Sequence, residues 1–146
     1  MITDLDILAD LARLRLTAEQ YAQGADRRDR QSWSQILADD CVIEGPGFST
    51  EGMEANLATL DTLSAMFRST QHRVHQVVAN INGDTAQGET YSTAEHLLKD
   101  SDIILAWAIR YQDTWRREAG TWRFTSRRLV VDWQETRPVS LVGSNP

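Results

Sequence analysis

Ser69-Thr70-Gln71-His72-Arg73-Val74-His75 marks the point at which the pattern of the chain changes. Before this stretch, apolar residues recur at the spacing of helices that bury one face. After it, apolar and polar residues alternate, which is typical of strands that bury one face. The chain therefore divides here into a helical first part and a β second part, and this order predicts an α+β fold.

Three helices are predicted before this stretch. The first carries a single apolar stripe, and Thr3 or Asp4 can cap its beginning. A short strand followed by the turn-forming Gly45-Pro46-Gly47 separates the second helix from the third. The predicted ranges are about residues 4–25, 29–37 and 50–67 for the helices and 41–44 for the strand.

Four long strands are predicted after it, over residues 70–81, 85–98, 103–117 and 121–134. The segments between them have turn chemistry, so consecutive strands should pair as an antiparallel meander. A strongly bent sheet with helices over its concave side leaves a cone-shaped hole, the kind of apolar site that small molecules use. We predict one α+β barrel domain over residues 1–137 and a loose C-terminal tail over 138–146.

The composition excludes several classes of protein. A chain of 146 residues fits one domain, and its formal charge of −6 disfavours nucleic acid or an anionic membrane as partner. No apolar run approaches membrane-spanning length, and the first residues lack the order of a signal peptide. The single cysteine, Cys41, has no partner for a disulfide, and no Cys/His cluster has zinc spacing. We expect a cytoplasmic protein that uses no metal.

Several short motifs, in their order along the chain, resemble one known family. They are Tyr21-Ala22-x-x-Ala25-Asp26-Arg27-Arg28-Asp29, Trp33, Leu37-Ala38-Asp39-Asp40-Cys41-Val42, Thr70-x-His72, Asn82-Gly83-Asp84-Thr85-Ala86, Tyr111, Gly120-x-Trp122-Arg123-Phe124, Arg127 and Asp132-Trp133. Over about residues 5–134 the chain resembles the SnoaL-like branch of the nuclear-transport-factor-2-like superfamily. The resemblance implies a cystatin-like fold, with a curved antiparallel sheet wrapped around three N-terminal helices.

Within this family, the motifs are similar to those of scytalone dehydratase, lindane dehydrochlorinase and bile acid 7α-dehydratase. The resemblance implies a catalytic pair, Asp26 and His72, and contacts to substrate from Tyr21 and Arg127, or from Arg128 if the register slips by one. Histidine changes its charge near neutral pH and can act as a general base. A carboxylate on the other ring nitrogen would orient it and stabilise the imidazolium, and this chemistry needs no cofactor.

Each of these residues also has a purely structural interpretation. Asp26 can be a surface charge beside two arginines, His72 a polar residue at the rim of the sheet, and Tyr21 a packing residue. His75, three positions after His72, should lie on the opposite face of its strand and be exposed. His96 can line the cavity, but a surface position is expected.

The motifs favour a lyase that catalyses a dehydration-like elimination on a small, largely apolar cyclic compound. An isomerase or a polyketide cyclase would use the same pair, because all of these enzymes remove a proton next to a carbonyl. The alternative from another class is a non-catalytic ligand-binding module or the small subunit of a ring-hydroxylating dioxygenase. On either interpretation we expect a homodimer or homotrimer, because the outer face of the long meander needs cover.

Overall fold

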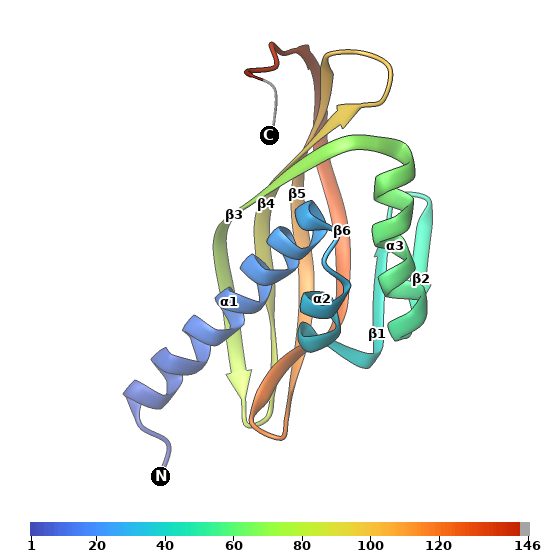
Figure 1. Cartoon of the computed structure of the whole chain (residues 1–146). Helices are drawn as coiled ribbons and strands as arrows, with labels where there is room; N and C mark the ends of the chain where they lie inside the picture. The colour runs from blue at the N-terminus through green and yellow to red at the C-terminus, as the bar shows by residue number, and fades with distance from the viewer. Residues whose placement is uncertain (144–146) are drawn as a thin grey trace.

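The computed structural model describes residues 1–143 and has an α+β architecture. Helices α1 and α2 lie over one face of a curved sheet, and α3 stands beside them (Figure 1). The strand order in the sheet is β2-β1-β6-β5-β4-β3. The elements are α1 (Asp4–Arg27), α2 (Arg30–Ile36), β1 (Leu37–Gly45), β2 (Phe48–Glu51), α3 (Met53–Met66), β3 (Phe67–Asn82), β4 (Thr85–Leu98), β5 (Ile103–Glu118) and β6 (Thr121–Pro138).

Helix α1 begins at a capping box and runs further than the sequence predicts. The Thr3 hydroxyl accepts the N–H of Asp6 at 3.1 Å, and the Asp6 carboxylate accepts the N–H of Thr3 at 2.9 Å. The helix continues through Gly24 to Arg27, and Arg28 ends it in the left-handed conformation with φ of 53°. Asp26 therefore lies in the last turn of α1, not beyond its end.

Gly24 is required by packing rather than by helix termination. A Cβ at this position would lie 2.6 Å from Cδ1 of Trp33, so only glycine lets the indole approach the helix this closely. Trp33 is 1% exposed, and its indole N–H donates to the carbonyl of Tyr21 at 2.9 Å. This contact fixes α2 against the end of α1, the segment that carries Asp26.

The four long strands form the predicted antiparallel meander, β3-β4-β5-β6. Strand β1 adds to this meander by pairing with β6 in parallel, with Ile43 opposite Arg127. Strand β1 also begins directly after α2, at Leu37, four residues earlier than the predicted strand. The sheet is mixed and stays open, with β2 and β3 at its edges, so the predicted barrel does not close.

The core fills the concave side of the sheet. Helix α1 contributes Leu14, Ala18 and Ala25, each at most 1% exposed. Phe124 on β6 and Trp115 on the neighbouring strand β5 are also almost fully buried, and they stack with 5.2 Å between ring centroids. The helices are thus held against the sheet by large side chains, and the end of α1 is brought to the beginning of β3.

The C-terminal boundary falls slightly later than predicted. Strand β6 extends to Pro138, and the N–H of Val139 donates to the carbonyl of Asp102 at 2.9 Å. Of the predicted tail, residues 144–146 lie outside the described residues. None of the helices within residues 1–143 is long and apolar enough to cross a membrane.

Candidate active site

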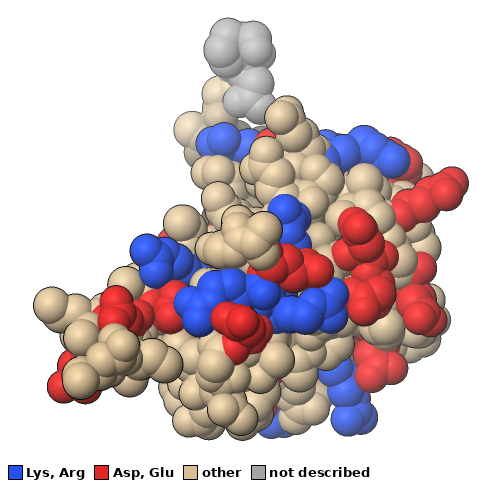
Figure 2. All heavy atoms as spheres, turned by 90° about the horizontal axis from the view of Figure 1, so that it is seen from below, with Lys and Arg blue, Asp and Glu red and all other residues tan. Residues whose placement is uncertain are grey.

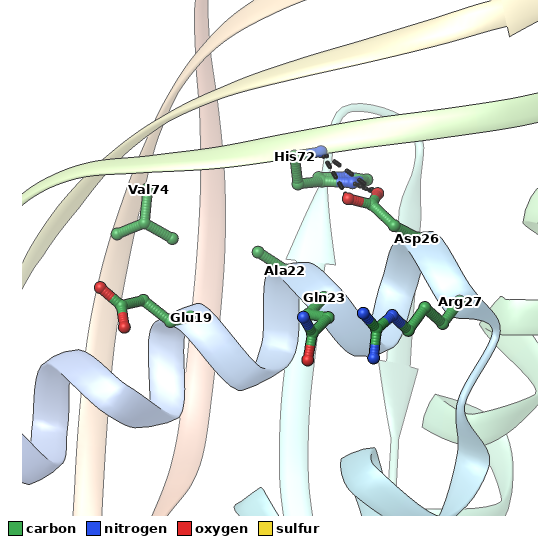
Figure 3. A pocket seen from close by; sticks show the side chains of 7 residues that line it. All are labelled: Glu19, Ala22, Gln23, Asp26, Arg27, His72 and Val74. Carbon is green, nitrogen blue, oxygen red and sulfur yellow. Dashed lines mark hydrogen bonds and ion pairs between the residues drawn. The ribbon is translucent and has the colours of Figure 1, made fainter.

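The structure brings His72 and Asp26 into direct contact, although 46 positions separate them in the sequence. Nδ1 of His72, on β3, lies 2.6 Å from Oδ1 of Asp26, on the last turn of α1 (Figure 3). The His72 side chain is 8% exposed and that of Asp26 is 20% exposed. The pair is therefore largely removed from water but still reachable.

Two further donors hold the Asp26 carboxylate through three contacts. The backbone N–H of His72 donates to Oδ2 at 2.9 Å and to Oδ1 at 3.2 Å, and the Thr70 hydroxyl donates to Oδ1 at 3.0 Å. Thr70 and His72 are two positions apart on β3, so their side chains lie on the same face of the strand. This is the local reason why Thr70-x-His72 forms a cradle for a carboxylate. Partly buried carboxylates need such partners.

Arg28 braces the cradle from the other side. Its guanidinium donates to the Thr70 hydroxyl at 2.8 Å and to Ser64 at 3.2 Å, and it also contacts the carbonyl of Ala25. Burial lowers the pKa of Arg28 from its ordinary value, and the charge of Asp26 opposes this effect. The left-handed cap of α1 thus places Arg28 where it holds the Thr70 hydroxyl, which in turn holds Asp26. The sequence did not indicate this role for Arg28 or Thr70.

The contact with Asp26 determines which ring nitrogen of His72 can react. An ionised carboxylate only accepts hydrogen bonds, so Nδ1 carries the proton in the neutral ring. Nε2 then has the free lone pair and can take a proton from another molecule. The arrangement has the elements of a carboxylate-oriented general base.

A groove with a volume of about 420 Å³ gives access to the pair between α1 and β3. Figure 3 shows Gln23 and Arg27 pointing away from His72, whereas Asp26 turns toward it. Strand β3 is an edge of the sheet, so this groove opens at the side of the molecule. The groove is lined by Glu19, Ala22, Gln23, Asp26, Arg27, His72 and Val74.

His96 does not lie at the surface, and this expectation is wrong. It is 4% exposed, and its ring lies 5.9 Å from that of His72 in an edge-on arrangement. Phe67 and Trp107 pack against it at 4.6 and 5.3 Å between ring centroids. The even-numbered residues of β4 face the helices, as Ala94 opposite His72 shows, and this alternation places His96 inside.

The chemistry of His96 is defined by its surroundings. Nδ1 lies 2.9 Å from the carbonyl of Leu105, which only accepts, so Nδ1 carries the proton and Nε2 is an acceptor. Burial lowers the pKa of His96, the hydrogen bond to Leu105 opposes this, and the neighbouring His72 adds to the lowering. His96 is therefore a neutral histidine beside a candidate base. His75, by contrast, is exposed as predicted, with Nε2 2.7 Å from the Thr93 hydroxyl.

Arg127 faces the interior and Arg128 is exposed, which settles the register of β6. The Arg127 guanidinium is bound to Asp113 by two contacts, of 2.8 and 3.1 Å, and Thr90 donates to the same carboxylate at 2.7 Å. Its central carbon lies 3.8 to 4.3 Å from the ring centroids of Tyr21, Tyr111 and Phe124. The structure thus shows Arg127 in a buried, aromatic-covered ion pair, and it gives no contact between Arg127 and His72 or Asp26 within residues 1–143.

Tyr21 belongs to the same aromatic group. It stacks on Trp33 with 4.4 Å between ring centroids and meets Tyr111 edge-on at 5.9 Å. Burial raises the pKa of both tyrosines, that of Tyr111 to about 12, while the charge of Arg127 opposes the shift. Among the smaller effects on Tyr111 is the charge of Asp26. The aromatic group and the His72–Asp26 pair are therefore electrostatically connected, but they are two distinct clusters.

No metal site is evident in the part of the chain that the structure describes. Residues 1–143 contain no group of three or more His, Cys, Asp or Glu side chains arranged to hold an ion. Nδ1 of His72 is held by Asp26, and Nδ1 of His96 by the carbonyl of Leu105.

Comparison with known proteins identifies the family. The model of the SnoaL-like domain matches residues 6–128, which is most of the chain. The chain belongs to the SnoaL-like domain family. No curated protein matches this SnoaL-like chain, so its relatives are seen through solved structures.

Three solved structures illustrate the likeness of this SnoaL-like domain. A putative scytalone dehydratase from Novosphingobium aromaticivorans DSM 12444 is 20% identical, with a TM-score of 0.80 over 95% of this chain and 93% of that one. The hexachlorocyclohexane dehydrochlorinase LinA-type3 from Novosphingobium barchaimii LL02 is 19% identical, with a TM-score of 0.83 over 99% of each chain. A protein with a cystatin-like fold from Nostoc punctiforme PCC 73102 is 21% identical, with a TM-score of 0.73 over 90% and 94%. At these identities the likeness shows the fold.

Proposed function

We propose that this SnoaL-like protein is a cofactor-independent lyase in which His72 is the general base and Asp26 orients it. One observation carries the proposal: a carboxylate held by the Thr70 hydroxyl and the His72 backbone N–H also holds Nδ1 of the nearly buried His72 ring at 2.6 Å, beside an accessible groove. A merely structural histidine at the rim of a sheet does not need such a preorganised carboxylate. Preorganised groups aimed at a developing charge are the usual source of enzymatic rate enhancement.

The proposed reaction is an elimination. Nε2 of His72 removes a proton from a carbon next to an activating group, and the electron pair of that C–H bond forms the new double bond. The bond to the leaving hydroxyl breaks, and the proton now on His72 passes to the hydroxyl, so that water departs and the base is regenerated. The Asp26 carboxylate stabilises the imidazolium between these two transfers.

His96 supports this chemistry through its neutral state. Its Nε2 is an acceptor in an apolar surrounding, at a ring separation of 5.9 Å from His72. A substrate hydroxyl that reaches Nε2 of both rings would donate to His96 and lie near the proton that His72 carries. In the proposed mechanism, His96 positions the leaving group.

The proposed substrate is a small, largely apolar compound with an aromatic or polycyclic skeleton. Ala22 and Val74 are the apolar side chains of the groove beside the pair, and Phe67 and Trp107 pack against the neighbouring His96. Flat rings match such walls, and a few polar groups are enough to fix their orientation. Tyr21 and Arg127 were predicted to contact substrate. We propose instead that they shape the site indirectly, as part of the aromatic group, because the Arg127 guanidinium is bound to Asp113.

The same apparatus would serve an isomerase or a polyketide cyclase, in which the abstracted proton or the carbanion has another fate. The product distinguishes these cases: an elimination releases water or another leaving group, and an isomerisation conserves the mass of the substrate. A non-catalytic module or a dioxygenase small subunit would convert nothing on its own.

The test is a panel of cyclic β-hydroxy ketones and related alcohols, followed by mass and by ultraviolet absorbance of the new double bond. We expect conversion by the wild type and a loss of about 10² to 10⁴-fold in His72→Ala, with a comparable loss in Asp26→Asn. The matched control is His75→Ala, an exposed histidine on the same strand, which should keep full activity. Full activity in His72→Ala, or equal losses in both histidine variants, would exclude the mechanism.

A further inference from the structure

Helix α1 has a second apolar face that the fold leaves uncovered. At about 100° per residue, Leu5, Leu8, Ala12 and Leu16 lie on the side of the helix opposite to the stripe that fills the core. We call these four residues the outer stripe. Leu5 is 77%, Leu8 61% and Leu16 50% exposed, and Ala12 is exposed as well. Contiguous exposed apolar side chains of this kind mark interaction sites.

The outer stripe is open to a large partner. The first turns of α1 project past the edge of the sheet (Figure 1). In Figure 2, the projecting end at the left of the molecule consists largely of atoms that are neither basic nor acidic, with acidic atoms among them. A helix in this position can receive another helix along its length.

The charges that flank the outer stripe select the partner and its direction. Asp4 and Arg15 lie along one side of the stripe, and Asp6 and Arg13 lie along the other. On both sides the acid is near the N-terminus and the base is further along. The side chains of Arg13 and Arg15 are 61% and 43% exposed, and each pairs on its own helix, Arg13 with Asp10 at 3.1 Å and Arg15 with Glu19 at 2.9 Å. A contact with a second copy would exchange one exposed ion pair for another, and exposed pairs are weak.

A second α1 laid antiparallel on the first makes every one of these contacts favourable. In one register, Asp4 lies opposite Arg15 of the second copy and Asp6 opposite Arg13. Within one to two residues of this register, Leu5 lies opposite Leu16 and Leu8 opposite Ala12. A parallel arrangement would instead bring acid against acid and base against base. The apolar and the charged positions thus both favour antiparallel packing of the two α1 helices.

We propose that the outer stripe of α1 is a homodimer interface, in which two copies pack α1 against α1 antiparallel about a two-fold axis. Such an isologous interface uses the same patch on both subunits, as the self-complementary charges require. The outer face of the sheet, where the sequence led us to expect self-association, is instead crossed by ion pairs such as Arg110–Asp132 at 2.8 Å. The stripe is only about 18 Å long, so the dimer is weak and reversible, with a dissociation constant on the order of micromolar.

Sedimentation velocity over a range from about 1 to 500 μM tests the interface. We expect a concentration-dependent monomer–dimer equilibrium in the wild type and at least a tenfold weaker one in Leu8→Glu/Leu16→Glu, roughly the effect of losing a central contact. Val78→Glu is the matched control, because Val78 is 66% exposed on β3; Trp133→Glu, at 71% exposure on β6, tests the sheet face. A wild type that stays monomeric, or a dimer lost in Trp133→Glu and kept in the α1 variant, overturns the proposal.

Cysteine cross-linking tests the direction. The natural Cys41 is buried, so an introduced thiol on α1 can be followed alone. A mixture of Leu8→Cys and Ala12→Cys chains should form the mixed disulfide several times faster than either variant forms its own. Faster formation of the two symmetric disulfides would indicate a parallel pair and contradict the register. Circular dichroism confirms that each variant is folded.

Discussion

One carboxylate holds His72 in two places: Asp26 accepts the backbone N–H through Oδ2 at 2.9 Å and lies 2.6 Å from the ring Nδ1 through Oδ1. Both the strand and the imidazole are therefore fixed relative to the last turn of α1. A histidine held only through its ring could swing with its strand. This double attachment explains why a base on an edge strand can be kept at a defined position.

Thr70 is expected to be a positioning residue. Thr70→Val removes the hydroxyl that donates to Asp26 and accepts from Arg28, so two partly buried charged groups each lose a partner. We predict a loss of about 1–3 kcal/mol in the free energy of unfolding, measured by urea denaturation. Thr70→Ser keeps the hydroxyl and should recover most of the loss. If the serine variant is as unstable as the valine variant, the stabilisation comes from the methyl group of Thr70 and not from its hydrogen bonds.

The Arg127–Asp113 pair is expected to stabilise the fold and not to carry the chemistry. Asp113→Leu or Arg127→Met alone leaves one buried charge without its partner, and each should cost about 3–5 kcal/mol in the free energy of unfolding. The double variant Asp113→Leu/Arg127→Met removes both charges and should be more stable than either single variant. Additive losses in this double-mutant cycle would contradict a direct pair.

Gly24 supplies a test of how α2 fixes the end of α1. Gly24→Ala introduces a methyl group 2.6 Å from the Trp33 ring, so the indole must shift and the helix gains strain. We predict a destabilisation of about 1–3 kcal/mol, although alanine is the better helix former. Gln23→Ala, an exposed neighbour, should change stability by no more than about 0.5 kcal/mol. A stabilised Gly24→Ala variant would show that the close approach of Trp33 is not needed.

The buried His96 makes stability depend on pH. Burial lowers its pKa in the folded chain, whereas in the unfolded chain it has its ordinary value of about 6.5. Below about pH 6.5 the unfolded chain therefore binds more protons, and the free energy of unfolding should fall as the pH falls. In His96→Phe this contribution to the slope between pH 7 and 5 should vanish, whereas His75→Ala should keep it. An unchanged slope in His96→Phe would contradict a neutral, buried His96.

The long strands were predictable because their signals are local. Alternation and turn residues placed β4 at residues 85–98, which are its observed bounds. The parallel pairing of β1 with β6 was not predictable, because it depends on where α2 delivers the chain and not on the residues of β1 themselves. The sequence predicts that α1 ends at about residue 25; the helix instead continues to Arg27, with Gly24 inside it, where it admits Trp33.

For the site, the sequence placed His72 and His75 on opposite faces by alternation alone, and proposed Asp26 from the family resemblance. It could not place His96, since no periodic signal said which face of β4 would be covered. It also missed Asp113, whose carboxylate determines what Arg127 can do. Ala94 and His96 are two positions apart on β4 and so share a face. This alternation places His96 inside only when Ala94 is known to pair with the inward-facing His72 on β3.

The most direct measurement of the central claim is the ¹⁵N NMR spectrum of the His72 imidazole, assigned by comparison with His72→Gln, in the wild type and in Asp26→Asn. If Asp26 orients a free base, the neutral ring of the wild type carries its proton on Nδ1 and has an unprotonated Nε2, and Asp26→Asn loses this preference. A wild-type His72 that carries its proton on Nε2, or a spectrum that Asp26→Asn leaves unchanged, would contradict the account.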